Sequence, residues 1–398
     1  MQVRQWPWVG LAPLVLIGAV LLPTAAMGQV TLGQLIPRVE KETRPPAEGF
    51  YLTPSLSIGQ LYDDNIFFSQ TNRQQDFFTR ISPGIQAGYQ STPLMLLGGY
   101  TFDSEFYSKH PEIDTIQMRQ RALIKLKAMP TELLTFSADG TYSKTRAPWE
   151  LNTFTGVAIR RVIADRIAFE PSMAYRLDPI TTATGEYTFS RDRVVGGTSI
   201  NSNIVRLGLD RRISTMDTVT TGYIGRQFEF VGVNTVTSHA FTLGWTHRFT
   251  PLTTLTVRAG PRVTEGSLDE SPEALVFLHH RLTNGELSLT YSNIQTTVIG
   301  TPARLITQSV GGSAAYELLP HLELRLSPNV MKITSENVDV TVYLTDAALT
   351  YQLTKWLALK ASHQFSFQQG HLSGAPEAEI RHNISWLRLV INYPYRLQ

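Results

Sequence analysis

The sequence predicts an all-β fold: a transmembrane antiparallel up-and-down β-barrel of about 18 strands, with 16 as the alternative count. Apolar and polar residues alternate with period two over segments of about ten residues, the length that a tilted strand needs to cross a bilayer. Short turn signals also alternate with longer polar connections along the chain. Finally, only 17% of the 398 residues are charged, against roughly 25% in soluble domains.

The first 28 residues have the order of a secretory signal peptide. Arg4 precedes an apolar run from Val9 to Leu22, and the small residues of Ala26-Met27-Gly28 follow. Because the run is shorter than the ~20 residues of a membrane-spanning helix, a cleavable signal is favoured over an N-terminal anchor. We therefore expect a signal peptide over 1–28, a periplasmic lead-in over 29–49 and an outer-membrane barrel over 50–398.

The period-two alternation begins near Phe50 and continues to the C-terminus, with no competing helical stripe. Clear examples are Phe241-x-Leu243-x-Trp245-x-His247-x-Phe249, Leu287-x-Leu289-x-Tyr291, Leu322-x-Leu324-x-Leu326 and the alternate positions from Leu387 to Leu397. The intervening residues are mainly Thr, Ser, Gly, Gln and charged residues. This pattern is typical of strands with lipid on one side and water on the other.

Turn signals divide the segments into hairpins. Tight turns are predicted at Ser91-Thr92-Pro93, Met129-Pro130-Thr131, Asp178-Pro179-Ile180, Ser214 to Asp217, Thr250-Pro251-Leu252, Thr283-Asn284-Gly285, Leu319-Pro320-His321 and Leu353-Thr354-Lys355. Longer polar connections are predicted at 63–76, 109–114, 147–155, 194–199, 266–272 and 368–377. These turns give about 18 strands with both termini in the periplasm, unless an irregular segment within 147–163 lowers the count to about 16.

A soluble β-sandwich is the alternative fold, but its strands are usually shorter, about five to six residues. A sandwich would also scatter its aromatic residues through the core, whereas here they cluster near segment ends. We expect them to form girdles at the two membrane interfaces. The clusters are Phe67-Phe68, Phe77-Phe78, Phe106-Tyr107, Phe228, Phe230, Phe365, Phe367, Tyr393 and Tyr395.

The composition gives no sign of nucleic-acid binding or of disulfides, because the net charge is +2 and Cys is absent. The sequence contains no phosphate loop, dinucleotide-binding motif, G-x-S-x-G or H-E-x-x-H. We therefore expect neither a cofactor nor an enzyme. A membrane-embedded hydrolase stays open as an alternative, because Ser and Thr are frequent.

The end of the first predicted strand reads Ser57-Ile58-Gly59-Gln60-Leu61-Tyr62-Asp63-Asp64-Asn65-Ile66-Phe67. Through Ser57, Gly59, Tyr62, Asp63, Asp64 and Asn65 it resembles the S-x-G-x-x-Y-D-D-N-[IV]-[FY] opening of a family of outer-membrane β-barrel porins associated with exopolysaccharide and capsule loci. The resemblance covers this short segment, and the hairpin order of the remaining chain agrees with it. It implies an outer-membrane barrel tied to polysaccharide secretion. The C-terminus, Leu397-Gln398, departs from the terminal aromatic residue common in barrels.

Two clusters contain residue types that bind metals, but neither has the spacing of a metal site. Asp63-Asp64-Asn65 lacks the further oxygen ligands of a calcium loop, so we expect a hairpin-loop start in which these side chains bond the backbone. His279 and His280 cannot both face one side of a strand, and no zinc partner stands at compatible spacing. We expect no metal.

Charged residues are expected to face the lumen, because Arg or Lys facing lipid costs about 2–4 kcal/mol at mid-depth. Met118, Ala122, Ile124 and Leu126 should face lipid, which turns a ladder of Arg119, Arg121, Lys125 and Lys127 inward. The same alternation turns inward Arg206, Arg212, Arg248, Arg258, Arg262, Arg325, Arg388 and Arg396. The inward acids are Asp103, Glu105, Asp139, Glu170, Glu186, Asp192, Asp210, Glu286, Glu317 and Glu323. Cross-strand ion pairs would neutralise part of this wall, and the arginine excess favours an anionic solute.

Since barrels of about 16–18 strands enclose water, these patterns predict an outer-membrane channel. The resemblance implies that this channel assists export of an exopolysaccharide or similar anionic polymer. The alternatives are a general diffusion porin, a structural barrel of an export complex, and an outer-membrane hydrolase. The expected partners are outer-membrane lipids, the barrel-assembly machinery, a polysaccharide and periplasmic export components, with no nucleic acid.

Overall fold

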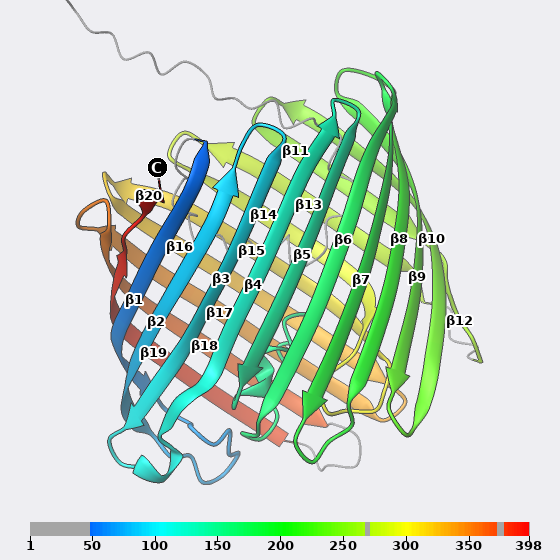
Figure 1. Ribbon diagram of the computed structural model, residues 1–398. Coiled ribbons are helices and arrows are strands. Elements are labelled where there is room, and N and C mark those ends of the chain that lie inside the picture. Colours follow the sequence, from blue (N-terminus) through cyan, green and yellow to red (C-terminus); the bar gives the residue numbers. More distant parts are fainter. Residues whose placement is uncertain (1–47, 267–270, 372–377, 398) are drawn as a thin grey trace, which may run out of the picture.

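The computed structural model describes residues 48–266, 271–371 and 378–397, and within them the chain forms a closed barrel (Figure 1). The predicted signal peptide and most of the lead-in lie outside the described residues. Strand β1 pairs with β2 on one side and with β19 and β20 on the other. Because the first and last strands pair, the sheet has no free edge.

The strands follow one another in sequence order around the wall. Their bounds are β1 (Gly49–Asp63), β2 (Asp76–Gln90), β3 (Leu94–Tyr107), β4 (Thr115–Thr131), β5 (Leu134–Thr145), β6 (Ala164–Asp178), β7 (Thr181–Val194), β8 (Ile200–Arg212), β9 (Asp217–Phe230), β10 (Asn234–Thr250), β11 (Thr253–Gly260), β12 (Arg262–Thr264), β13 (Glu273–Leu282), β14 (Gly285–Thr296), β15 (Leu305–Leu319), β16 (Leu322–Ser335), β17 (Val338–Gln352), β18 (Leu357–His371), β19 (Ala378–Asn392) and β20 (Tyr395–Leu397). Two short 3-10 helices, η1 (Pro111–Ile113) and η2 (Pro148–Glu150), lie in connections.

These segments form 18 barrel strands, because two strands are interrupted at a proline. Segments β11 and β12 flank Pro261 and both pair with β10. Segments β19 and β20 flank Pro394 and both pair with β1. Proline has no backbone N–H to donate to the ladder, which accounts for both interruptions. The prediction of an antiparallel barrel of about 18 strands is confirmed.

Large apolar side chains cover the outside of the wall. On β10, Phe241 and Leu243 are each 63% exposed, while Thr242 between them is buried on the lumen side. Exposed apolar surface that extends around a sheet marks contact with lipid. Among the described residues, no helix is long and apolar enough to cross a membrane.

The connections alternate in length as expected, with three differences. The predicted tight turns all join strands at the end of the barrel that carries the termini. At the opposite end, which we call the outer end, the hairpin pattern predicts longer connections, yet two of them are the short turns 231–233 and 336–337. A longer connection at 297–304 was missed, and 368–371 extend β18 rather than forming a loop.

The prediction of aromatic girdles is wrong for several residues. Phe77, Phe106, Tyr393 and Tyr395 are exposed on the outer surface as expected. Phe78, Tyr107, Phe228 and Phe230 are instead buried in small apolar clusters at the outer end. Phe68 is buried beside Trp149 and His382. Connections fold over the inward positions there, so an aromatic side chain can be buried on the lumen side of the sheet.

Candidate functional site: a constricted lumen

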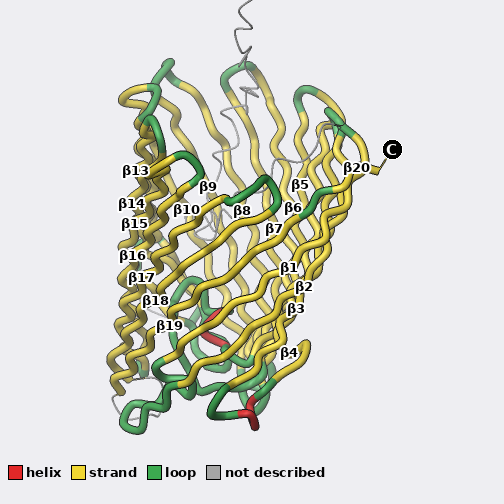
Figure 2. Tube along the Cα trace, turned by 90° about the vertical axis from the view of Figure 1, so that its left-hand side faces the viewer, coloured by secondary structure: helices red, strands yellow, loops and turns green. Residues whose placement is uncertain are grey.

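The connection 146–163, which we call the first crossing loop, leaves β5 and runs through the interior before it joins β6. Figure 2 shows its helix η2 inside the ring of strands. Val157 is fully buried and Ala158 nearly so, although both lie in a connection. The backbone N–H of Ala158 donates to Oε1 of Gln368 on β18 at 2.8 Å. The loop therefore reaches from the β5–β6 wall to a distant part of the barrel.

Local sequence bends this loop inward. Pro148 begins η2, where its missing N–H is not needed. The Oγ1 of Thr145 accepts from the N–H of Ala147 at 3.0 Å and donates to Oε2 of Glu150 at 3.0 Å. Gly156 has φ +60°, and a Cβ there would lie 2.7 Å from Cε of Met331. Only glycine fits this close approach without strain.

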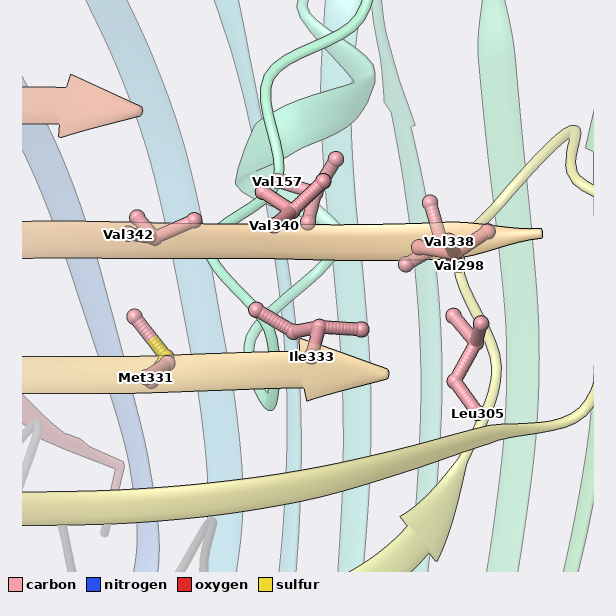
Figure 3. Packing of buried hydrophobic residues seen from close by; sticks show 8 residues of the cluster. All are labelled: Val157, Val298, Leu305, Met331, Ile333, Val338, Val340 and Val342. Carbon is pink, nitrogen blue, oxygen red and sulfur yellow. The ribbon is translucent and has the colours of Figure 1, made fainter. Parts of the chain in front are cut away.

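The loop docks on an apolar platform inside the barrel. Figure 3 shows Val157 facing the platform residues of strands β16 and β17. The cluster consists of Met331, Ile333, Val338, Val340 and Val342, packed with Val157, Val298 and Leu305, all at most 1% exposed.

Sequence reasoning missed this platform because it assigned alternating apolar residues to the lipid side. Two pairs of consecutive apolar residues, Val330-Met331 and Val342-Tyr343, could have indicated the platform. Consecutive residues of a strand face opposite sides of the wall, so one apolar side chain of each pair must face the lumen. Val330 and Tyr343 are 42% and 38% exposed on the outside.

A second crossing loop, 297–304, meets the first one. Val298 and Ile299 are buried, and Gly300 forms a β-bridge with Thr198 in the distant β7–β8 connection. Asn152, itself 3% exposed, joins the two loops. Its Nδ2 donates to the carbonyl of Val157 at 2.9 Å, and its Oδ1 accepts from the N–H of Ile299 at 3.0 Å. Two connections from opposite walls thus hold each other in the lumen.

Arg119, the first member of the predicted ladder, is neutralised at this constriction. Its guanidinium lies 3.3 Å from Asp103 and 2.7 Å from Glu150 of the first crossing loop. Arg80 pairs with Glu105 at 2.6 Å beside it. Arg119 therefore ties the loop to the wall instead of adding net charge to the lumen.

The other ladder members lie on the same face of β4, toward the terminal end. Lys125 stands opposite Asp139 in the β4–β5 register. Arg121 stands opposite Thr101 and Ser143, and Lys127 stands opposite Ser137. Within the described parts of the chain, neither Arg121 nor Lys127 forms an ion pair.

Three more predicted arginines belong to a buried wall of opposite charges. Arg206 pairs with Glu186 at 2.5 Å, and Arg262 pairs with Glu273 at 3.0 Å. Arg258 is 7% exposed and lies beside Gly244 of β10, where a Cβ would meet the Nε of Arg258 at 3.4 Å.

Sequence reasoning did not single out several further cations of the interior. Arg226 shares Glu273 at 2.5 Å, and Arg166 pairs with Asp192 at 2.5 Å. Arg161 of the first crossing loop donates to the Tyr107 hydroxyl at 2.7 Å. These arginines lie near strand ends or in a loop, where the period-two alternation is weakest. The alternation therefore did not predict that they face the interior.

Two predicted arginines lie at the terminal end of the barrel. Arg212 is exposed and donates to the carbonyl of Pro179 at 2.8 Å. Arg248 is exposed near the turn after β10. Neither forms an ion pair with another described residue. Arg325 pairs with Glu323 on its own strand, and the side chain of Arg396 lies outside the described atoms.

The Ser57–Asn65 motif closes the seam between the first and last strands. Asp64 accepts from the backbone N–H and the Nδ2 of Asn383 on β19 at 2.7 and 2.6 Å. Asn65, fully buried, donates to the carbonyl of Arg381 at 2.9 Å. A Cβ at Gly59 would lie 2.7 Å from Cβ of Arg388, so the strands approach closely there.

The same segment has the hairpin-start geometry expected for it. Oδ1 of Asp63 accepts from the N–H of Asn65 at 2.8 Å, and Tyr62 donates to Gln75 at 2.6 Å. Ser57 lies within β1, opposite Ser82 and Val390. No group of three metal-binding side chains occurs among the described residues.

A closed wall, an apolar exterior, a charged interior and loops folded into the lumen define a membrane β-barrel with porin-like architecture. No family model matches the chain, and no curated protein matches its sequence. Solved structures similar to it include OccAB4 of Acinetobacter baumannii, with 9% identity, a TM-score of 0.48, and coverage of 87% of this chain and 98% of that one.

Two Pseudomonas aeruginosa proteins are also similar. OccK8 (OprE) has 11% identity and a TM-score of 0.46, covering 88% of this chain and 100% of the other. OpdO has 11% identity and a TM-score of 0.45, covering 88% and 98%. With identities this low, nothing about transport is carried over from these proteins to this chain.

Proposed function

We propose that the chain is an outer-membrane channel for small hydrophilic solutes, that is, the general diffusion porin among the alternatives above. The observation that carries this proposal is the pair of crossing loops. They narrow the lumen by contacts between opposite walls through Asn152 and Val157. Two loops fixed across the lumen leave a narrower path than an open barrel would, which favours passage of small solutes over polysaccharide export.

The motif that resembles capsule-associated porins does not change this preference. Its Asp64 and Asn65 bond β19 and so join the first and last strands, a role that is independent of any solute. The resemblance therefore supports the barrel more than it supports a polysaccharide.

We further propose a modest preference for anions. At the constriction, Arg119 and Arg80 each have an acidic partner. The wall arginines Arg206 and Arg262 are paired as well. Several inward bases without an ion pair among the described residues lie nearer the terminal end of the barrel. They include Arg121, Lys127, Arg212 and Arg248. Cations on a confined wall attract anions to the pore entrance.

Planar-bilayer recording tests this function. Purified protein should produce discrete conductance steps, and in a KCl gradient the reversal potential should have the sign of anion preference. Liposomes that contain the protein should swell with monosaccharides and fail to swell with large oligosaccharides. Absence of conductance from folded, heat-modifiable protein would overturn the channel and favour a structural barrel. Swelling that does not depend on sugar size would contradict the constriction.

A further inference from the structure

A row of polar side chains lies on the outside of the barrel at the outer ends of β5 to β9. We call it the outer polar band. It consists of Lys144, Asp165, Arg191, Arg193, Asn201, Asn203, Gln227 and Glu229.

The strand register places this band directly above the lipid-facing surface. Arg191 stands opposite Ile167, which is 41% exposed on the outside. Asn203 stands opposite Phe189 and is two residues from Val205, which is 38% exposed. A guanidinium or amide facing outward is costly in hydrocarbon and inexpensive at the interface. The band therefore marks the level at which lipid headgroups meet the barrel.

Several members of the band are held by one another. Arg193 pairs with Asp165 at 3.0 Å. Asn201 donates to Glu229 at 2.8 Å, and the hydroxyl of Tyr187 donates to Oδ1 of Asn203 at 2.6 Å. With a further bond from Nδ2 of Asn203 to Oε1 of Gln227 at 3.5 Å, these contacts link side chains of β7, β8 and β9 along the wall.

Two cations of the band have no such partner. Arg191 is exposed and Lys144 is half-buried, and neither makes a hydrogen bond or ion pair with another described residue. Lys144 and Arg193 stand on either side of Asp165 in the register of three adjacent strands. Arg191 lies two residues along β7 from Arg193, so strand spacing and rise put Lys144 and Arg191 roughly 12 Å apart.

Outward cations on the other side of the barrel differ. On β16, Lys332 bonds Asp339 of β17, and Arg381 of β19 lies 5.1 Å from the ring centroid of Phe367. Among the described strand residues that face outward at this rim, the cations without a partner therefore lie on the β5–β7 face.

We propose that the outer polar band binds the phosphorylated saccharide headgroup of an outer-leaflet glycolipid. Lys144 and Arg191 receive its phosphates, the amides of Asn203 and Gln227 bond its sugar hydroxyls, and its acyl chains lie along Ile167, Phe169 and Val205. Arginine and lysine bind phosphate by charge-assisted hydrogen bonds, and the apolar wall below accepts the chains. The inference rests on the proposed outer-membrane location and is independent of channel activity.

Binding of diphosphoryl lipid A to the purified full-length protein tests the inference, with native mass spectrometry as the readout. Dephosphorylated lipid A and phosphatidylglycerol serve as comparison lipids. The Lys144→Gln/Arg191→Gln variant should bind diphosphoryl lipid A roughly 30-fold more weakly, since each cation near a charged headgroup contributes about fivefold. Lys332→Gln, which removes a partnered cation at the same rim, should bind like the wild type.

Asn203→Ala/Gln227→Ala should weaken binding of lipid A and leave phosphatidylglycerol binding unchanged. Equal binding of phosphorylated and dephosphorylated lipid A would overturn the role of the two cations. An equal loss of lipid A affinity in the Lys332→Gln control would show a general attraction to anionic lipids and overturn the site. Wild-type affinity for phosphatidylglycerol equal to that for lipid A would have the same meaning. Conductance in bilayers without lipid A reports on the channel separately, so the two proposals fail independently.

Discussion

The first crossing loop can be released by one substitution, Val157→Asp. Val157 is fully buried against Met331, Val340 and Val342, and the platform offers an added carboxylate no donor among its apolar side chains. The change should leave the wall intact, because the strands on either side of the loop keep their ladder bonds. Val195→Asp, at an outer connection where the valine is 64% exposed, is the matched control.

The size of the effect follows from the contacts of the docked loop. Burial of Val157 contributes about 1.5–3 kcal/mol. The two hydrogen bonds of Asn152 and the one from Ala158 to Gln368 contribute about 0.5–1.5 kcal/mol each. Val157→Asp removes the first contribution and adds at least the penalty of about 1–3 kcal/mol for a buried polar group without a partner, because a carboxylate is also charged. The loss is thus comparable with the whole docking free energy of these contacts.

Single-channel recording measures the result. The Val157→Asp channel should show a larger mean conductance, more frequent transitions between levels, and faster liposome swelling with sugars that the wild type excludes. Val195→Asp should behave like the wild type. If Val157→Asp is folded and heat-modifiable but has wild-type conductance and size exclusion, the crossing loops do not limit passage and the reasoning is refuted.

The ladder, the seam and the chain ends give four further predictions. Replacing both Arg121 and Lys127 by Gln should shift the reversal potential toward cations, and a cation-selective wild type would contradict the proposed preference. Asp64→Ala should lower the temperature of heat modification on gels by removing both bonds to Asn383, and an unchanged temperature would show that the seam does not depend on them. The wild type should run faster on a gel when unheated, because a closed barrel has no edge from which to unzip; identical mobility before and after boiling would count against closure. N-terminal sequencing of membrane-extracted protein should begin at Gln29, whereas Met1 would exclude cleavage.

The sequence by itself determined the wall of the barrel. Alternation such as Phe241-x-Leu243-x-Trp245 has the period of a strand and distinguishes two faces, since successive side chains point to opposite sides. Tight turns at one end and longer connections at the other then set the strand order and the count of about 18. These signals are local, so they can be followed without knowing which strands become neighbours around the ring.

Only the tertiary structure decided what fills the lumen. The apolar platform of Met331 and Val340 has the same alternation as a lipid-facing stripe, and its partner Val157 is far away in sequence. The compensation of the Arg119 charge likewise depends on Glu150, which reaches the guanidinium only because the loop folds inward. The period-two alternation shows which residues lie on the same face of a strand. Which face meets lipid, and which loop covers the other, depends on contacts between distant segments that no local pattern records.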